Sequence, residues 1–248
     1  MQTLRSGVAL STLFFAAMGF AGAQAAPVVF SGIDANGNAN VALASTPNAD
    51  AARNALFANL AGVGTETFET RSGSSPLAIN FGAAGTATIN GPGSVASVTP
   101  GTTNGFGRYS VPSATSSRFW EADAGTGGIT VTFSAPVAAF GFYGIDIGDF
   151  SGTVVLRLTD TGGATSLLNV PAAASGRADG SVLYFGFYDT AVQYTSIAFL
   201  TTGGSGDVFA FDNFSIGSIE QVVPVPEPMS LALFGLGLAG LGVIRRKR

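Results

Sequence analysis

The sequence predicts an all-β domain, a sandwich of two sheets, over residues 65–219. Apolar and polar residues alternate in several segments, and glycine-rich turn signals recur about every 8 to 12 residues. No segment of helical period interrupts this series, so the helix-connected parallel strands of βαβ units are not expected. An up-and-down barrel is the alternative architecture.

Strands are expected first where the alternation has a period of two. Residues 129–133 and 154–159 place apolar side chains at every second position, which is typical of a half-buried strand. Glycine-rich segments at residues 125–128 and 161–163 border them and predict tight turns.

Four further strands are expected after residue 136. Residues 137–143 and 182–188 are apolar on both faces, which indicates central strands covered on both sides. Residues 194–200 and 208–216 complete the series. This number of short strands predicts a sandwich of jelly-roll type, either concanavalin-like or galactose-binding-like.

One helix is expected in the segment of residues 26–64, which precedes the predicted sandwich. Thr46 followed by Pro47 is typical of an N-cap with proline at the first helical position. Apolar residues then recur near helical spacing, which predicts a helix over residues 47–60; they are Ala49, Ala52, Leu56 and Leu60. Because this stripe is mostly alanine, a linker is the alternative.

Residues 1–25 have the pattern of a secretory signal peptide. Arg5 supplies the positive charge, residues 8–20 form the apolar stretch, and Ala23 and Ala25 form a small-residue cleavage site. The stretch is too short to span a bilayer. A buried N-terminal helix is the alternative, and an exported protein is expected.

The C-terminal segment, residues 220–248, has three parts in order. A proline-rich stretch ending in Pro226, Glu227 and Pro228 cannot continue a helix. The apolar residues 229–244 follow, which as a transmembrane helix would rise about 24 Å. The chain then becomes basic, which places this end on the cytoplasmic side of the inner membrane; the basic residues are Arg245, Arg246, Lys247 and Arg248.

These three parts resemble the PEP-CTERM sorting signal. The resemblance implies processing by an exosortase-type enzyme, in bacteria that make extracellular polysaccharide. The protein would lie on the periplasmic side of the inner membrane before processing, and at the cell surface or in the extracellular matrix afterwards. An ordinary C-terminal membrane anchor is the alternative.

Composition excludes several functions. The chain has no His and no Cys, which excludes a Ser-His-Asp triad, His-ligated zinc and disulfides. Residues 26–228 hold six Arg against fifteen acidic residues, a net charge near −9. Such a surface disfavours nucleic acid as a partner and suits divalent cations.

Calcium is the expected cofactor, because it takes oxygen ligands and needs neither His nor Cys. Glu69 in an early strand and Asp212 in a late one resemble the edges of carbohydrate-binding jelly-roll modules, which implies one structural calcium. The alternative for this pair is that both acids are solvated or cap turns. Strand alternation places Asp212 on the face of Phe214, hence at the rim of the sandwich. Asp146 and Asp149 are a second, weaker pair, for which turn-type hydrogen bonding is an equal explanation.

Trp120 and Tyr109 are the candidates for stacking against a sugar, with a core position as the alternative for each. The expected function is that of an exported, non-catalytic protein of the cell surface or matrix that associates with extracellular polysaccharide. A calcium-dependent carbohydrate-binding module is one alternative. An extracellular glycan hydrolase is the other, since acidic residues are available to act as a catalytic pair.

Overall fold

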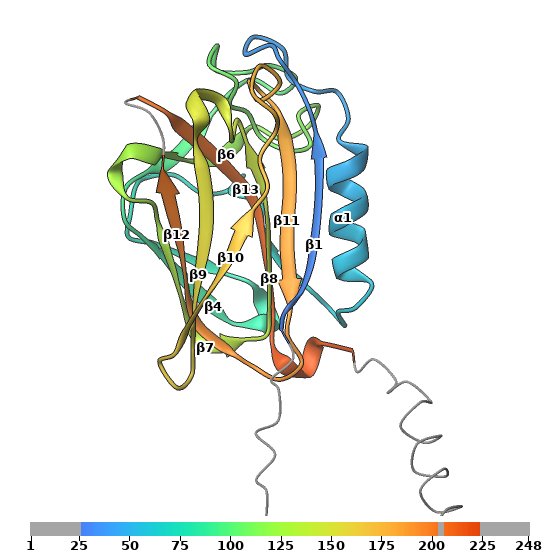
Figure 1. The fold of residues 1–248 in the computed structure, drawn as a ribbon, viewed down its shortest axis with the longest axis vertical. Coiled ribbons are helices and arrows are strands. Elements are labelled where there is room, and N and C mark those ends of the chain that lie inside the picture. Colours follow the sequence, from blue (N-terminus) through green and yellow to red (C-terminus); the bar gives the residue numbers. More distant parts are fainter. Residues whose placement is uncertain (1–25, 203–205, 224–248) are drawn as a thin grey trace, which may run out of the picture.

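The computed structural model describes residues 26–202 and 206–223, which form two antiparallel sheets packed face to face (Figure 1). The predicted β-sandwich is confirmed. The predicted signal peptide with Ala23 and Ala25 lies outside the described residues. So does the predicted sorting segment, from Pro226 to the basic residues at 245–248.

Within the described residues, the larger sheet has seven strands in the order β1-β11-β8-β13-β6-β5, with β2 also paired to β13. Every pairing in it is antiparallel. Its strands are β1 (Val28–Asp34), β2 (Gly64–Glu66), β5 (Ser94–Ser97), β6 (Arg118–Asp123), β8 (Ala139–Ile145), β11 (Val182–Tyr188) and β13 (Val208–Gly217).

The smaller sheet has six described strands in the order β10-β9-β12-β7-β4-β3, again all antiparallel. They are β3 (Leu77–Asn80), β4 (Thr86–Asn90), β7 (Thr130–Val137), β9 (Thr153–Asp160), β10 (Thr165–Val170) and β12 (Tyr194–Thr202). The short 3-10 turns η1 (Gly82–Ala84), η2 (Ala124–Thr126), η3 (Asp149–Ser151) and η4 (Ile219–Gln221) lie between strands or after the last one.

Phenylalanine rings fill the space between the sheets. Phe142 of β8 contacts rings from both sheets, including Phe199 at 4.9 Å and Phe211 at 5.8 Å between centroids. Every residue of β8 and β11 is buried, as the apolar character of both their faces predicts. One face of these strands packs on the smaller sheet and the other beneath the helix.

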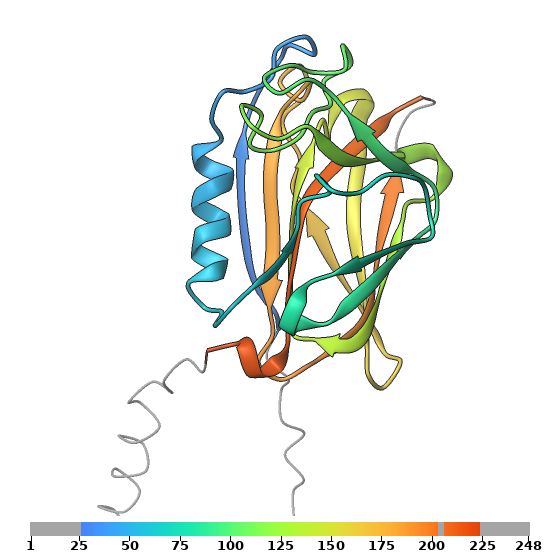
Figure 2. The ribbon, with the colours of Figure 1, turned by 180° about the vertical axis from the view of Figure 1, so that it is seen from behind.

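The helix α1 (Pro47–Phe57) lies against the outer face of the larger sheet, beside β1 and β11 (Figure 2). Its buried Leu56 packs over Gly186 of β11, where a Cβ atom would lie only 2.7 Å from Leu56 Cδ2. The helix is shorter than the predicted range 47–60, because the chain leaves the helical conformation after residue 57 and continues as a turn.

Thr46 is the N-cap residue and Pro47 begins the helix, as predicted. Thr46 makes no side-chain cap hydrogen bond. Instead Asp34, the last residue of β1, accepts the backbone N–H groups of Asn48 at 3.2 Å and Ala49 at 2.9 Å. The residues 26–64 are therefore bound into the sandwich, which begins at β1 rather than at residue 65.

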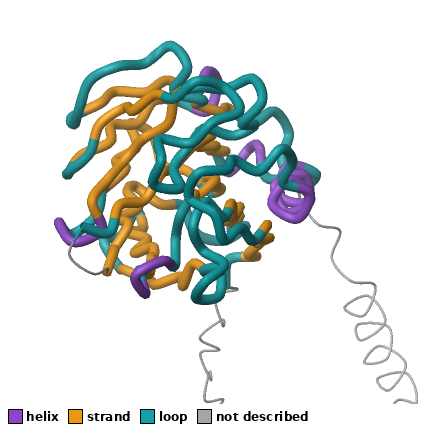
Figure 3. The backbone as a smooth tube through the Cα atoms, turned by 90° about the horizontal axis from the view of Figure 1, so that it is seen from above, coloured by secondary structure: helices purple, strands orange, loops and turns teal. Residues whose placement is uncertain are grey.

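The two ends of the sandwich differ. The first described residues and η4 lie at one end, whereas the loops after β1, β5, β8 and β10 gather at the opposite end (Figures 1 and 3). At the first end Val28 pairs with Tyr188, and at the opposite end Asp34 pairs with Val182. In the described ranges no helix has the length and apolar character needed to cross a membrane.

Candidate functional site at one end of the sandwich

A cavity of about 440 Å³ opens at the loop-rich end of the sandwich. It is formed by the loop between β5 and β6, by η3, by the loop before β11 and by the start of β13. Its functional side chains are Phe106, Arg108, Asp149, Phe150 and Asp179. We call this cavity the end pocket.

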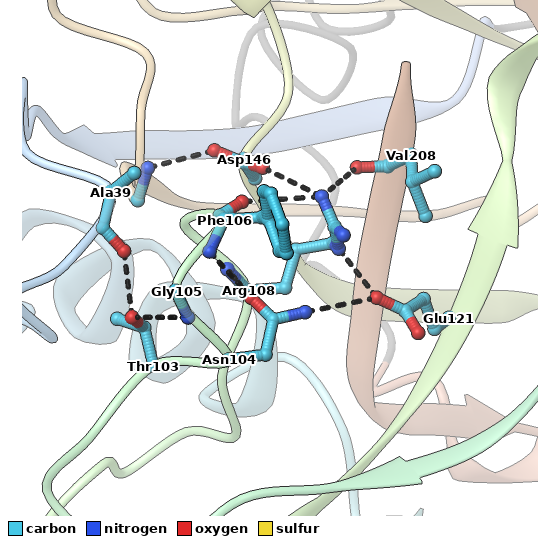
Figure 4. Close-up of polar contacts among 10 residues, drawn as sticks. Ala39, Thr103, Asn104, Gly105, Phe106, Arg108, Glu121, Asp146 and Val208 are labelled. Atoms are coloured by element: carbon cyan, nitrogen blue, oxygen red, sulfur yellow. Dashed lines mark hydrogen bonds and ion pairs between the residues drawn. The ribbon is translucent and has the colours of Figure 1, made fainter. Parts of the chain in front are cut away.

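Arg108 is held in one orientation within the end pocket (Figure 4). Its Nε donates to Glu121 Oε1 at 2.5 Å, and its Nη1 lies 3.5 Å from Asp146 Oδ2. The same Nη1 donates to the carbonyl oxygens of Phe106 at 3.2 Å and Val208 at 3.4 Å. These contacts come from three separate segments, so the guanidinium group is fixed by the fold.

Phe106 lies in the solvent beside this guanidinium group, with 69% of its surface exposed. Asn104 Oδ1 accepts the backbone N–H of Phe106 at 2.9 Å, which closes a tight turn in the glycine-rich loop. The Arg108 guanidinium carbon lies 5.7 Å from the centre of the Phe106 ring, within range for a cation–π contact. One face of the Phe106 ring therefore packs near the guanidinium group.

Phe150 is the second exposed ring of the end pocket, with 74% of its surface in solvent. Its backbone has a φ of 45°, which is unusual for a residue with a bulky side chain. Two exposed large aromatic side chains thus line one pocket. Exposed apolar groups gathered in this way are typical of interaction sites.

Asp146 and Asp149, the weaker of the two predicted metal-binding pairs, are brought together in this region. One oxygen from each lies within 4.8 Å of the other and of an oxygen of Asp179. Asp146 is buried, and its Oδ1 accepts the backbone N–H of Gly180 at 2.8 Å. Burial raises the pKa of Asp146 to about 7, and burial also raises that of Asp149.

Glu69 and Asp212, the preferred predicted pair, are also neighbours, but outside the end pocket. Asp212 is fully buried, and its carboxylate accepts the N–H of Val111 at 2.8 Å and the N–H of Asn213 at 2.7 Å. Glu69 accepts the N–H groups of Ser117 at 2.9 Å and Arg118 at 2.8 Å. Because these oxygens accept hydrogen bonds, fewer of their lone pairs are free to bind a cation. Calcium at Glu69 and Asp212 stays a prediction.

The electrostatics of the two carboxyl groups differ. Burial raises the pKa of Asp212 to about 8, and its hydrogen bonds offset only part of this effect. Burial also acts to raise the pKa of Glu69, but the hydrogen bonds from Arg118 and Ser117 outweigh it and lower the pKa below its usual range.

Two local expectations at this pair were wrong. Strand β2 ends at Glu66, and Phe68 has a φ of 59°, so Glu69 follows the strand instead of lying within it. The pairing of β13 with β8 shifts between Asp212 and Ser215, with Asn213 at a φ of 49°. This β-bulge puts Phe214 between the sheets and Asp212 on the opposite face.

Trp120 and Tyr109 were expected at a ligand-binding surface, and both lie in the core. Trp120 is fully buried between the sheets, next to Phe68. Tyr109 is 1% exposed, and its hydroxyl donates to the carbonyl of Gly180 at 2.8 Å. Neither ring can stack against a ligand in this structure.

Sequence reasoning missed Phe106, Phe150 and Asp179. For Phe106 a signal was present, because Asn104 and the flanking glycines predict a turn that projects the phenylalanine between them. No comparable sequence signal indicates Asp179, because it reaches the pocket only through the long-range packing of its loop.

Together, the fold and the end pocket define a class of protein: a β-sandwich domain with an open, aromatic-lined site at the end opposite its first and last described residues. Residues 224–248 match the PEP-CTERM protein-sorting motif. The predicted PEP-CTERM sorting signal is confirmed for this segment. The protein is therefore a β-sandwich domain followed by a sorting motif.

Two solved structures that match this chain each contain a CBM22-1 module. One is the CBM22-1 xylan-binding domain of Paenibacillus barcinonensis Xyn10C, with 14% identity, TM-score 0.34, and 65% of this chain and 94% of that chain covered. The other is the CBM22-1–GH10 part of Clostridium thermocellum xylanase 10B complexed with xylohexaose, with 11% identity and TM-score 0.32. That match covers 61% of this chain and 27% of the xylanase chain. A comparison with curated proteins found no match.

Proposed function

We propose that this protein is an exported, non-catalytic component of the cell surface or extracellular matrix that associates with extracellular polysaccharide through the end pocket. The observation that carries the proposal is the pair of exposed rings, Phe106 and Phe150, in a pocket that also holds Arg108 and Asp179. Aromatic surfaces with a few fixed polar groups are the usual composition of small-molecule sites.

The polar groups fit a neutral sugar better than an anionic one. Arg108 is already paired with Glu121 and Asp146, so little of its positive charge is free for an acidic ligand. Asp149 and Asp179 add negative charge to the same wall. Hydroxyl groups donate to carboxylates and accept from guanidinium groups, which makes an uncharged glycan the best partner.

The sorting motif explains how the protein would reach the cell surface or matrix. An exosortase-type enzyme is the expected processing partner, and the inner membrane holds the C-terminal segment before cleavage. The final location we propose is the cell surface or the matrix.

A glycan-binding assay tests the role of the pocket. The wild-type chain should bind at least one neutral polysaccharide, and a Phe106→Ala/Phe150→Ala double variant should lose about tenfold or more of that affinity, since two stacking surfaces are removed. Leu167→Ala is the matched control, because Leu167 is 61% exposed and does not line the end pocket.

Equal binding by the double variant and the wild type would contradict the pocket assignment. Release of sugar fragments during the assay would instead select a glycan hydrolase, in which two of the pocket carboxylates act as the catalytic pair. Loss of binding on chelation, without product release, would select a calcium-dependent binding module.

A further inference from the structure

A fourth aspartate, Asp207, lies next to the group formed by Asp146, Asp149 and Asp179, of which the last two line the end pocket. It immediately precedes β13 and packs against η3, with its carboxyl group within hydrogen-bonding reach of that of Asp149. Asp146, Asp149, Asp179 and Asp207 therefore converge from three separate parts of the chain. We call them the aspartate cluster.

The side chain of Asp207 is the unusual member. It is 1% exposed, and neither of its carboxylate oxygens has a hydrogen-bond partner among the described residues. Asp149 Oδ1 is also buried without such a partner. A buried, ionised carboxylate that lacks both hydrogen bonds and a counter-charge is costly, so two of them in contact must share a proton or hold a cation between them.

The protein supplies little positive charge here. In the described part of the chain, Arg108 is the cation with an ion pair to the cluster, and its Nη1 reaches only Asp146, at 3.5 Å. The Nε of the same guanidinium group is bound to Glu121. One arginine shared with a fifth carboxylate leaves the four aspartates mostly uncompensated.

Glycines make room for these carboxylates. A Cβ atom on Gly152 would lie 2.2 Å from Asp207 Oδ2, and one on Gly107 would lie 2.2 Å from Asp146 Oδ1. The backbone closes over these two carboxyl groups. Asp146 Oδ1 still accepts the Gly180 N–H, whereas both oxygens of Asp207 are left without a donor among the described residues.

We infer that the aspartate cluster is a binding site for one calcium ion, held through Asp146, Asp149 and Asp179, with Asp207 behind Asp149. Carboxylate oxygens without protons or amide partners are the ligands calcium prefers, and flexible geometry lets it accept several of them. The site shares Asp149 and Asp179 with the pocket of the proposed function, but calcium binding is measured without any glycan, so either proposal can fail without the other.

Calorimetric titration with CaCl₂ tests the site. The full chain in detergent, stripped of metal with a chelator, should bind one calcium, and its thermal midpoint should rise with calcium concentration. Asp149→Asn and Asp207→Asn should each weaken binding about tenfold or more. Glu220→Gln removes one negative charge at the far end of the sandwich and should leave the titration unchanged.

The thermal midpoint measured without metal shows whether a variant has lost a calcium ligand or has a damaged fold. Because Asp207→Asn removes an uncompensated buried charge and preserves the shape, its midpoint in chelator should equal or exceed that of the wild type, while its response to calcium should need about tenfold more of the ion. Absence of calcium binding in the wild type would mean that a shared proton alone joins Asp149 and Asp207, and would overturn the inference. So would a calcium affinity that both variants leave unchanged.

Discussion

Glu69 and Asp212 share one hydroxyl group. Ser110 Oγ lies 2.7 Å from Asp212 Oδ2 and 3.4 Å from Glu69 Oε1, so a serine from the loop between β5 and β6 joins two acids from distant parts of the sequence. Of the two, only Asp212 is fully buried, and the negative charge of Glu69 adds to the effect of burial on its pKa. The pair is thus an unequal one, with Glu69 ionised and Asp212 able to hold a proton near neutral pH.

The first prediction is that stability falls as the pH rises from about 5 to about 8. The folded-state pKa of Asp212, raised to about 8, lies above its unfolded value, so the folded protein binds more protons in this window. The free energy of unfolding must then decrease with pH, by at most about 1.4 kcal/mol per pH unit for one group. Urea unfolding in chelator at several pH values measures the slope.

Asp212→Asn isolates this group. The amide cannot ionise, so the slope should be smaller than in the wild type, although overall stability drops by about 1–3 kcal/mol because an amide N–H₂ group must face one of the donors. An unchanged slope would show that Asp212 does not titrate in this range.

The second prediction concerns the aromatic side chains. Trp120→Ala should cost about 3–5 kcal/mol of unfolding free energy, because it leaves a large cavity in the core. Phe106→Ala should change stability by less than about 0.5 kcal/mol, because that ring is mostly in solvent. Chemical unfolding measures the free energy of unfolding of both variants. A similar loss of stability in the two would contradict the placement of Trp120 in the core and Phe106 in solvent.

The third prediction places the helix cap at Asp34. Asp34→Ala should destabilise the protein by about 1–2 kcal/mol, since two backbone N–H groups of the first turn lose their acceptor. Thr46→Val keeps the side-chain shape and should have almost no effect, because Thr46 makes no cap hydrogen bond. Thermal unfolding of the two variants provides the comparison, and a larger loss in Thr46→Val would reverse the assignment.

The fourth prediction concerns processing at the sorting motif. In the native producer, the mature protein should end close to Pro226, Glu227 and Pro228, because closely spaced prolines disfavour a helix and an enzyme cuts a non-helical stretch more readily. Mass spectrometry of the protein released from cells determines the C-terminal residue. Recovery of released protein that still ends in Arg248 would contradict it.

Much of the sandwich could be predicted because its strands bury alternating side chains. The bounds of β11 equal the expected residues 182–188, and β9 differs by one residue at each end. The strand β1 was missed, because its pairing with β11 is a long-range contact that no local pattern records. The bulge at Asn213 was missed for a related reason. The alternation pattern assumes an uninterrupted ladder of paired residues, and one added residue turns every later side chain of the strand to the opposite face of the sheet.

The candidate site was predictable only in part. Asp146 and Asp149 could be found because both follow a buried strand directly, where a loop must begin. Asp179 and Asp207 join them only when three loops close over the same end of the sandwich. The aromatic residues were misassigned because residue type alone does not distinguish the buried Trp120 from the exposed Phe106.

Strand β13 joins the two ends of the sandwich. It begins at Val208, in the wall of the end pocket, and runs about 30 Å to Gly217, six residues before the last described residue of this segment. The chain is held again at that exit, where the Val223 N–H donates to the Asn59 carbonyl at 2.9 Å. A pull between a ligand in the pocket and the C-terminal segment would therefore load β13 along its length. Its hydrogen bonds to β8, β6 and β2 would have to shear together, so the same strand that positions the pocket would also make the domain resistant to mechanical force.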